Sequence, residues 1–427
     1  MMTPKKWMGW GFSLFLGVGI LFYFLLSKPS ARPVQTVERL QFLRPSITNL
    51  VPTLKLKGYG TKGEEGFWRE KIHEFELQNK CAVLVQWSSQ EEGYYQELRT
   101  GQESWDLIMV SDTELEGLHQ SNRLTPLSLP SELETKMIPR VLSLFRRGEF
   151  YEAIPYQFST LALYYNKQIF DRRGVAYPDD HWTWEDLLAI ARGLYVDSKS
   201  GKGCYGIEMD WSWKLLNLFA GQSGEVLLSD TMMMNPHPER ATVLGVQWLI
   251  DLAQNYAVDI ASPEEGELSY FEKGEAAMAI TGVSLMNRLK IHHEFIWGVT
   301  VLPKGKIKSN HLSAQGWGVW GESKQRELAY SLLLHLTKQS PLFGGLPVYQ
   351  PDIQQLNLPP ESYFYEAIAN SNPMTSHPLI YLWKEKVKNH WSAVLNGVGT
   401  SASVWMDEIN IEIQSSVERV ERERGSK

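Results

Sequence analysis

Strand-like runs that alternate with helix-like runs are the feature that most limits the folds open to this chain. Residues 53–60 alternate polar and apolar side chains and end in glycine, which is typical of a strand. Trp68, Ile72 and Phe75 then recur at the spacing of one helix face, and residues 82–87 begin the same order again. This alternation predicts an α/β layer architecture with a largely parallel sheet.

A cap marks the start of one further helix. Thr183 and Asp186 form an S/T-x-x-D/E pattern just ahead of Leu187, Leu188, Ala191 and Leu194, which predicts that a helix begins there.

The length and the charge narrow the class of protein further. A chain of 427 residues exceeds the size that one core usually fills, so we expect two domains or two lobes. The net charge of -7, without an extended basic run, argues against a nucleic-acid partner. Two cysteines, Cys81 and Cys204, are too few for a disulfide framework or a zinc site, and the sequence leaves their pairing open.

The N-terminal region predicts where the protein resides. Residues 7–27 contain no Asp, Glu, Lys or Arg. As a helix this segment would span about 30 Å, the thickness of one hydrocarbon core. We interpret it as a retained transmembrane anchor, because the flank SKPSARP (residues 27–33) offers no clean cleavage site; a cleaved signal peptide is the alternative.

The flanks of this segment complete the predicted topology. Lys5 and Lys6 favour a cytoplasmic tail of residues 1–6, and residues 28–50 form a proline-punctuated linker. We therefore expect an exported body, anchored to the outer face of the cytoplasmic membrane in the periplasm or at the cell surface.

Catalytic and metal-binding motifs are missing from the sequence. There is no GxSxG elbow, no phosphate-binding GxxxxGKS/T loop and no GxGxxG fingerprint. His292, His293 and Glu294 are adjacent and cannot share one face of a helix or strand, so we interpret them as a polar surface turn. We expect no catalytic residue, no bound metal and no cofactor.

Trp211 and Trp213 follow the strand-like residues 204–210, where a loop of an α/β protein can open onto a cleft. Indole faces suit the apolar faces of sugar rings, which suggests a carbohydrate site. The alternative is that both side chains pack internally, because tryptophan is highly buried on average.

Five segments in order resemble one known family, the extracellular solute-binding proteins of family 1, which are the sugar-binding components of ABC importers. They are YEAIPYQFSTLALYYNKQIFDRRGV (151–175), WTWEDLLAIARGL (182–194), YFEKGEAAMAITGVSLM (270–286), GVTVLPKG (298–305) and GWGVWGESKQRELAYSLLLHLT (316–337). The similarity extends over about residues 53–415.

The resemblance implies a maltose-binding-protein-like, type II periplasmic-binding-protein fold. Each of its two lobes has a mostly parallel sheet flanked by helices, and the ligand cleft lies between them. The chain would cross near Pro155–Ser159 and near Ser313–Gly316. The first lobe would hold residues 51–156 and 313–352, and the second lobe would hold residues 157–312 and 353–427.

Positions in these motifs also imply a set of ligand-binding residues. They are Ser111, Asp112, Ser159, Trp211, Trp213, Ser284, Trp317 and Trp383. Asp112 can accept two hydroxyl hydrogen bonds or instead cap its loop. Trp317 lies between two glycines at the second crossing, with core packing as its alternative. Trp383 either stacks on the ligand or anchors the C-terminal helix.

One departure from the family pattern bears on the ligand. Gly282, Val283 and Ser284 stand where many members carry Gly-Pro-Trp, which removes a stacking face and disfavours a maltodextrin-like ligand.

The sequence therefore predicts a monomeric, non-enzymatic receptor that closes over a carbohydrate or related polar solute and presents it to an ABC permease in the membrane. Two alternatives remain: a membrane-anchored carbohydrate-active enzyme, and a ligand-sensing scaffold that has lost transport.

Overall fold

The computed structural model divides the chain into two units, Met1–Leu50 and Val51–Lys427. It describes residues of the second unit only, namely 51–425 without 197–202, 229–233, 235–239, 256–257, 260–268, 292–293, 342–343 and 351–359. The predicted tail, membrane span (7–27) and linker (28–50) thus lie outside the described residues. Among the helices that are described, none is long and apolar enough to cross a bilayer.

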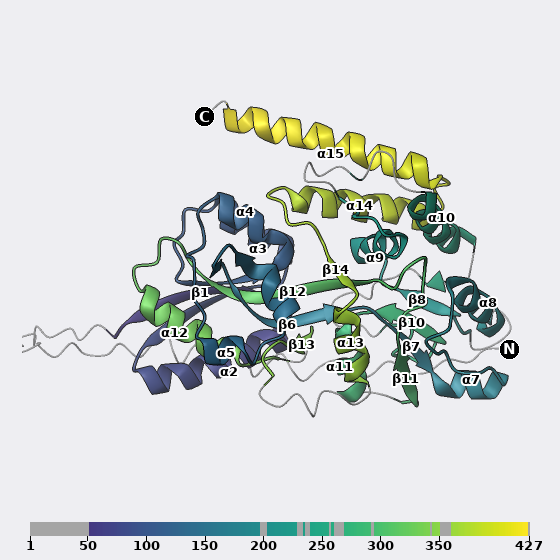
Figure 1. Ribbon diagram of the computed structural model, residues 1–427, viewed down its shortest axis with the longest axis horizontal. Helices are drawn as coiled ribbons and strands as arrows, with labels where there is room; N and C mark the ends of the chain where they lie inside the picture. Colours follow the sequence, from purple (N-terminus) through teal and green to yellow (C-terminus); the bar gives the residue numbers. More distant parts are fainter. Residues whose placement is uncertain are drawn as a thin grey trace, which may run out of the picture. The chain divides into compact units, whose positions relative to one another are not determined.

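The first sheet has seven strands in the described chain, in the order β13-β6-β12-β3-β1-β2 with β14 beside β12 (Figure 1). Their bounds are β1 (Thr53–Tyr59), β2 (Ala82–Ser88), β3 (Leu107–Ser111), β6 (Ile154–Thr160), β12 (Asn310–Val319), β13 (Leu346–Pro347) and β14 (Ser371–Pro373). β1 pairs in parallel with β2 and β3, whereas β12 runs antiparallel to β3 and β6.

The second sheet has five strands in the described chain, in the order β11-β7-β10-β8-β9. Their bounds are β7 (Ala162–Asn166), β8 (Ile207–Met209), β9 (Val258–Asp259), β10 (Met278–Thr281) and β11 (Trp297–Thr300). β8 pairs in parallel with β9 and β10, and β7 is antiparallel to β10 and β11. Both sheets are therefore more mixed than the strand–helix alternation alone suggests. A short hairpin, β4 (Arg146–Arg147) and β5 (Phe150–Tyr151), stands apart.

Helices cover both sheets. Those beside the first sheet include α2 and α12, and those beside the second include α7 and α8 (Figure 1). The α-helical bounds are α2 (Lys62–Asn79), α3 (Glu91–Thr100), α4 (Leu115–Gln120), α5 (Ser131–Glu134), α6 (Pro139–Leu142), α7 (Lys167–Arg173), α8 (Trp184–Leu194), α9 (Trp213–Ser223), α10 (Arg240–Asn255), α11 (Val283–Ile291), α12 (Arg326–Thr337), α13 (Glu361–Ile368), α14 (Ile380–Leu395) and α15 (Ala402–Gly425). Two 3-10 turns are η1 (Asp112–Glu114) and η2 (Ser143–Phe145).

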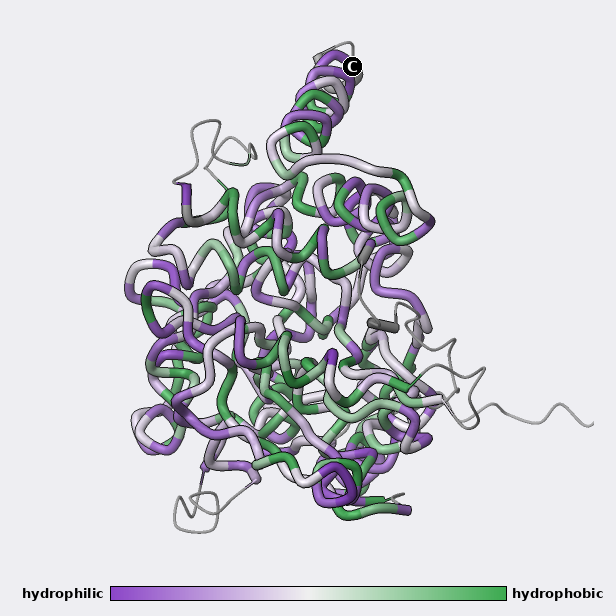
Figure 2. Tube along the Cα trace, turned by 90° about the vertical axis from the view of Figure 1, so that its right-hand side faces the viewer, coloured by the Kyte–Doolittle hydropathy of each residue, from purple (hydrophilic) through white to green (hydrophobic). Residues whose placement is uncertain are grey.

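The helix face and the helix cap that the sequence predicts are present in the structure. Trp68, Ile72 and Phe75 form the buried face of α2, as predicted. The Thr183 side chain accepts a hydrogen bond from Asp186 N, and the Asp186 carboxylate accepts one from Thr183 N, so the predicted capping box of α8 is confirmed. Hydrophilic and hydrophobic residues alternate along α15 (Figure 2).

Two hydrophobic clusters make up the core. One surrounds the first sheet and contains Trp68 and Trp317; the other joins the second sheet to α9, α10, α14 and α15 and contains Trp383. Cys81 and Cys204 are both free thiols, so they do not pair with each other.

β6 leads the chain from the first sheet into the second, because β7 begins only two residues after β6 ends. β12 pairs with β6 along the segments where the two crossings are expected. The pairing of β12 with β6 shifts register between Gln315 and Gly316, because Tyr156 of β6 lies between their partners Gln157 and Pro155. A Cβ on Gly316 would lie 2.6 Å from the Ile154 carbonyl oxygen. Only glycine permits this close approach. The lobe boundaries themselves stay a prediction.

Candidate ligand-binding site

Two adjoining cavities lie where strands of both sheets end. The inner cavity has a volume of about 220 Å³ and the outer one about 480 Å³, and they share Glu91, Asp210, Trp213 and Lys384. The inner cavity is lined from one side by the ends of β1 and β3 and the middle of β6 and β12, and from the other by residues that follow β8 and β10. Ligands of α/β proteins commonly bind at such strand ends.

The structure brings six of the eight predicted ligand residues to these cavities. Five line the inner cavity, namely Ser111, Asp112, Ser159, Trp213 and Ser284. Trp211 lines the outer cavity. Their role as ligand contacts stays a prediction.

Trp317 and Trp383 lie elsewhere. Trp317 is fully buried and packs edge-to-face on Trp68, with ring centroids 5.1 Å apart. Trp383 is fully buried in the cluster around the second sheet. As far as the described residues outline the two cavities, neither indole lines them. Both side chains thus take the core-packing alternative: Trp317 packs on Trp68 and Tyr156, and Trp383 belongs to the buried face of α14.

Asp112 is the cavity residue with the most unusual surroundings. Its side chain is 5% exposed, and Oδ1 accepts a hydrogen bond from Ala314 N at 3.1 Å. Oδ2 is buried and has no hydrogen-bond partner in the described part of the chain. Burial raises the pKa of Asp112 to about 7, against the lowering effect of the Ala314 hydrogen bond and of Lys384. The carboxyl group therefore accepts a hydrogen bond from β12, across from its own loop.

A network of amides and phenols forms the floor on the first-sheet side. Gln315 Oε1 accepts hydrogen bonds from Gln157 Nε2 at 2.7 Å and from Tyr156 OH at 2.9 Å. Gln315 Nε2 donates to Tyr59 OH at 2.8 Å. Gln157 Oε1 is buried and has no hydrogen-bond partner among the residues that are described. Sequence reasoning missed both glutamines, although they lie within two residues of Ser159 and Trp317.

Lys384 is the main cation of the site and was also missed. Its Nζ donates to Thr113 Oγ1 at 2.8 Å and lies 3.5 Å from Glu114 Oε1 and 3.7 Å from Glu91 Oε1. Burial opposes the charged form of Lys384, but nearby carboxylates outweigh it and hold its pKa above the ordinary value. Burial also raises the pKa of Glu114, and Lys384 partly offsets that effect.

The spacing of apolar residues in α14 could have indicated where Lys384 points. Ile380, Trp383, Val387, Trp391 and Val394 form the buried stripe of α14. Trp383 belongs to this stripe, and its neighbour Lys384 therefore projects from a different face of the helix.

The two predicted tryptophans of the outer cavity differ in accessibility. Trp211 is 9% exposed and packs on Trp391 with ring centroids 5.2 Å apart. Trp213 is half-buried; Lys384 Nζ lies 5.3 Å from its ring centroid and the His311 ring meets it edge-on at 4.9 Å. The indole of Trp213 is thus already engaged by a cation.

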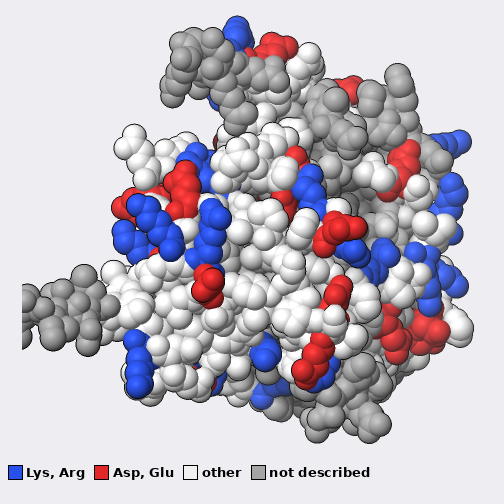
Figure 3. Space-filling view, turned by 60° about the vertical axis from the view of Figure 1, so that its left-hand side comes forward, with Lys and Arg blue, Asp and Glu red and all other residues white. Residues whose placement is uncertain are grey.

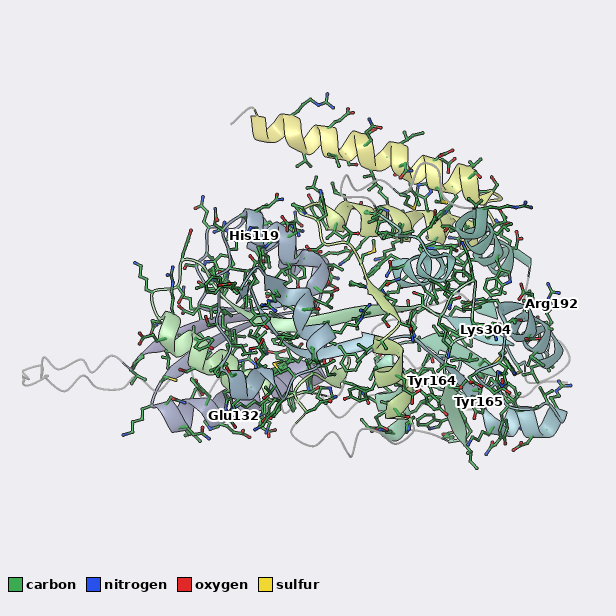
Figure 4. The ribbon with its side chains drawn as sticks, in the orientation of Figure 1. His119, Glu132, Tyr164, Tyr165, Arg192 and Lys304 are labelled. Atoms are coloured by element: carbon green, nitrogen blue, oxygen red, sulfur yellow. The ribbon has the colours of Figure 1, made fainter. Side chains whose placement is uncertain are left out.

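The turn after β10 is held against β6. Ser159 Oγ accepts a hydrogen bond from Val283 N at 3.2 Å, and Tyr164 OH donates to the Gly282 carbonyl at 2.7 Å. Tyr164 lies on β7, next to Tyr165 (Figure 4). A Cβ on Gly282 would lie 2.7 Å from Ser159 Oγ, so glycine lets this turn approach the crossing strand.

The balance of acidic and basic side chains differs between the protein surface and the inner cavity. On the face drawn in Figure 3, basic and acidic side chains are interspersed. The inner cavity instead is lined by four carboxylates and two lysines, an excess of acid. They are Glu64, Glu91, Asp112, Asp210, Lys214 and Lys384. Within the described ranges, no group of three or more His, Cys, Asp and Glu side chains is arranged to hold a metal ion.

Comparison with solved structures establishes the fold. An ABC substrate-binding protein from Listeria monocytogenes in complex with cycloalternan has a TM-score of 0.73 and 20% identity, covering 86% of this chain and 99% of that one. The Thermus thermophilus maltotriose binding protein bound with maltotriose has a TM-score of 0.68 and 18% identity, covering 85% and 100%. The maltose/maltodextrin-binding domain from Bdellovibrio bacteriovorus, bound to maltotriose, has a TM-score of 0.68 and 17% identity, covering 86% and 100%.

These matches confirm the predicted two-lobed α/β fold of the maltose-binding type. The family model described as "Bacterial extracellular solute-binding protein" matches residues 62–339, which is more than half of the chain. The chain therefore belongs to the bacterial extracellular solute-binding protein family.

Proposed function

We propose that this protein is the extracytoplasmic receptor of an ABC importer and that it binds a carbohydrate or related polar solute by closing its lobes. The observation that supports it most is the inner cavity, where hydroxyl, amide and carboxylate side chains from the two sheets face one space. Asp112 Oδ2 and Gln157 Oε1 need donors that no described residue supplies, and a polyhydroxyl solute has them.

Closure would link binding to a change of conformation. A solute that contacts residues of both sheets stabilises the arrangement in which they face each other, and this shifts the population toward that state. The closed receptor would then deliver the solute to a permease in the membrane. Anchoring through residues 7–27, outside the described residues, would keep a monomeric receptor near that permease.

The test is a thermal-shift screen of the full-length protein in detergent against mono- and oligosaccharides, polyols, sugar phosphates, amino acids and polyamines. A ligand at about 100 times its dissociation constant should add about 2.7 kcal/mol to the free energy of unfolding. Each stabilising compound is then incubated with the protein and analysed for products. Saturable sugar binding without turnover supports the proposal. Product formation would favour a carbohydrate-active enzyme. If no compound of the screen stabilises the protein, a scaffold that has lost transport is favoured.

Two tryptophan variants test the placement of the site. Trp213→Ala should weaken sugar binding by about tenfold, because a residue that lines the cavity loses its contact surface. Trp317→Phe should lower stability and leave the dissociation constant of the folded protein within about twofold, because Trp317 packs on Trp68 in the core. Isothermal titration with the best sugar of the screen measures both. A large affinity loss in Trp317→Phe alone would restore Trp317 as a ligand contact.

A further inference from the structure

The charges of the inner cavity carry information about its solute. Its two lysines are already compensated, because Lys214 Nζ lies 3.7 Å from Asp210 and Lys384 Nζ lies 3.7 Å from Glu91. Lys384 also reaches the buried carboxylate of Glu114. An anionic solute would therefore find its cationic partners occupied and would add to an excess of negative charge.

Two carboxylates of the inner cavity remain after these pairs, and they differ. Glu64 Oε2 accepts hydrogen bonds from Thr61 N at 2.8 Å and Thr61 Oγ1 at 3.0 Å in the capping box of α2. Asp112 has one bond through Oδ1, and its Oδ2 finds no donor anywhere in the described chain. Among the described residues of this cavity, Asp112 is thus the carboxylate with a buried oxygen that has neither an ion pair nor a hydrogen bond, although the charge of Lys384 acts on it from a distance.

A second unpartnered acceptor lies close to Asp112 in the fold. On β12, Gln315 is paired with Gln157 of β6 on one side and with Ser111 of β3, the neighbour of Asp112, on the other. Gln157 is 4% exposed, lines the inner cavity and presents an Oε1 for which the described residues offer no donor. Three adjacent strands thus bring a carboxylate and an amide oxygen to one wall.

A cationic group with several N–H donors would satisfy the unpartnered oxygens Asp112 Oδ2 and Gln157 Oε1. An ammonium group offers three donors and no acceptor, which matches unpartnered acceptors. A neutral hydroxyl also donates, yet it leaves the excess negative charge in place, and a hydrogen bond between two charged partners is stronger than one with a neutral partner. The remaining lining of serine, threonine and glutamine side chains suits hydroxyl groups.

We propose that the solute is an amine-bearing carbohydrate, whose ammonium group binds between Asp112 Oδ2 and Gln157 Oε1 while its hydroxyls contact the polar side chains of the cavity. This inference rests on the proposed function, because it assigns a substrate class to the same cleft. Uncharged and acidic sugars of the same shape should bind more weakly.

The test uses isothermal titration of the full-length protein in detergent at pH 7.5 with matched sugars. Glucosamine, N-acetylglucosamine and glucose differ only at carbon 2; glucuronic acid adds an anion, and β1,4-linked oligomers and the galactose and mannose counterparts cover other shapes. In the series that binds, the free-amine sugar should bind about tenfold or more tightly than its neutral partners, since a charge-assisted hydrogen bond replaces a neutral one.

Variants assign the effect to this wall. Asp112→Asn should remove most of the amine preference, and Gln157→Met should reduce it. Glu132→Gln is the matched control, because Glu132 is an exposed carboxylate on α5 (Figure 4) that lines neither the inner nor the outer cavity, and it should keep the full preference. Urea unfolding of each variant shows whether it is folded.

The outcomes separate this inference from the proposed function. Neutral sugars that bind as tightly as the amines, or an amine preference that survives in both folded cavity variants, would overturn the inference and leave the carbohydrate receptor intact. Binding of spermidine or of amino acids with no binding of any sugar would overturn the inference and, with it, the carbohydrate assignment of the proposed function.

Discussion

At the scale of a single residue, Asp112 is nearly buried and still lines a cavity: it is 5% exposed, and it belongs to the lining of the inner cavity. A carboxyl group in this position has lost most of its hydration, and the charged form is disfavoured. Burial is the largest cause of its raised pKa of about 7, and Lys384 reduces the effect. The residue is thus able to change its charge near neutral pH.

This shift makes the stability of the protein depend on pH. The folded-state pKa of about 7 exceeds the ordinary 3.8, so the folded protein keeps a proton that the unfolded chain releases. The stability from this proton is fully present below about pH 4 and is lost as the pH rises through about 7. The amide of an Asp112→Asn variant cannot titrate, so between pH 5 and pH 8 its free energy of unfolding should rise by about 1–3 kcal/mol relative to wild type. Urea unfolding followed by tryptophan fluorescence measures this; parallel pH profiles would contradict it.

At the scale of elements, short-range signals determine where helices begin. Thr183 and Asp186 exchange hydrogen bonds at the first turn of α8, whose buried residues include Leu187, Ala191 and Leu194. These partners lie within one or two turns of each other, so the helix can form from local interactions and then pack against the second sheet.

Removing the cap of α8 should destabilise the protein by a known amount. Thr183→Ala deletes the oxygen that accepts from Asp186 N and should lower the free energy of unfolding by about 1 kcal/mol. Thr183→Ser keeps the hydroxyl and should lose less than about 0.5 kcal/mol. Thermal and urea unfolding measure both variants. An equal loss in the two would show that the Thr183 methyl group, and not the cap, is responsible.

At the scale of the whole described unit, Lys384 connects parts that lie far apart in the sequence. It projects from α14, which is packed in the cluster around the second sheet, and it contacts Thr113, Glu114 and Glu91, which follow or flank the strands of the first sheet. A cation here compensates carboxylates that the fold has brought together.

The loss of this cation should be costly. Lys384→Met removes the ammonium group from Glu114, which keeps Arg99 as its remaining partner at 2.7 Å, and should lower the free energy of unfolding by about 1–2 kcal/mol, less than the loss of a sole buried partner. Lys386→Met on the same helix is the control: its partner Glu412 is largely solvent-accessible, so the loss should stay below about 1 kcal/mol. Urea unfolding measures both variants. An equal loss of unfolding free energy in Lys384→Met and Lys386→Met would show that Lys384 does not stabilise the protein through the buried carboxylates.

The sequence by itself determined the features that arise from neighbours along the chain. The spacing of Trp68, Ile72 and Phe75 identified α2, the Thr183–Asp186 pair identified the start of α8, and the order of the motifs identified the family and its two-lobed fold. Ser111, Asp112 and Ser159 were placed at the cleft because they follow or lie on strands whose positions the motifs indicate.

Only the tertiary structure decided which side chains face the cavity. Gln315 and Trp317 are two residues apart on β12, yet Gln315 lines the inner cavity, whereas Trp317 lies farther along the strand, opposite Met109 of β3, and packs on Trp68 in the core. Lys384 enters the site from α14, more than 270 residues after Thr113, and its partners are visible only once the chain has folded. A local sequence pattern specifies one helix or strand, because its partners lie nearby in the chain. The contacts of a binding site depend on how distant helices and strands pack, and no short stretch of sequence contains that information.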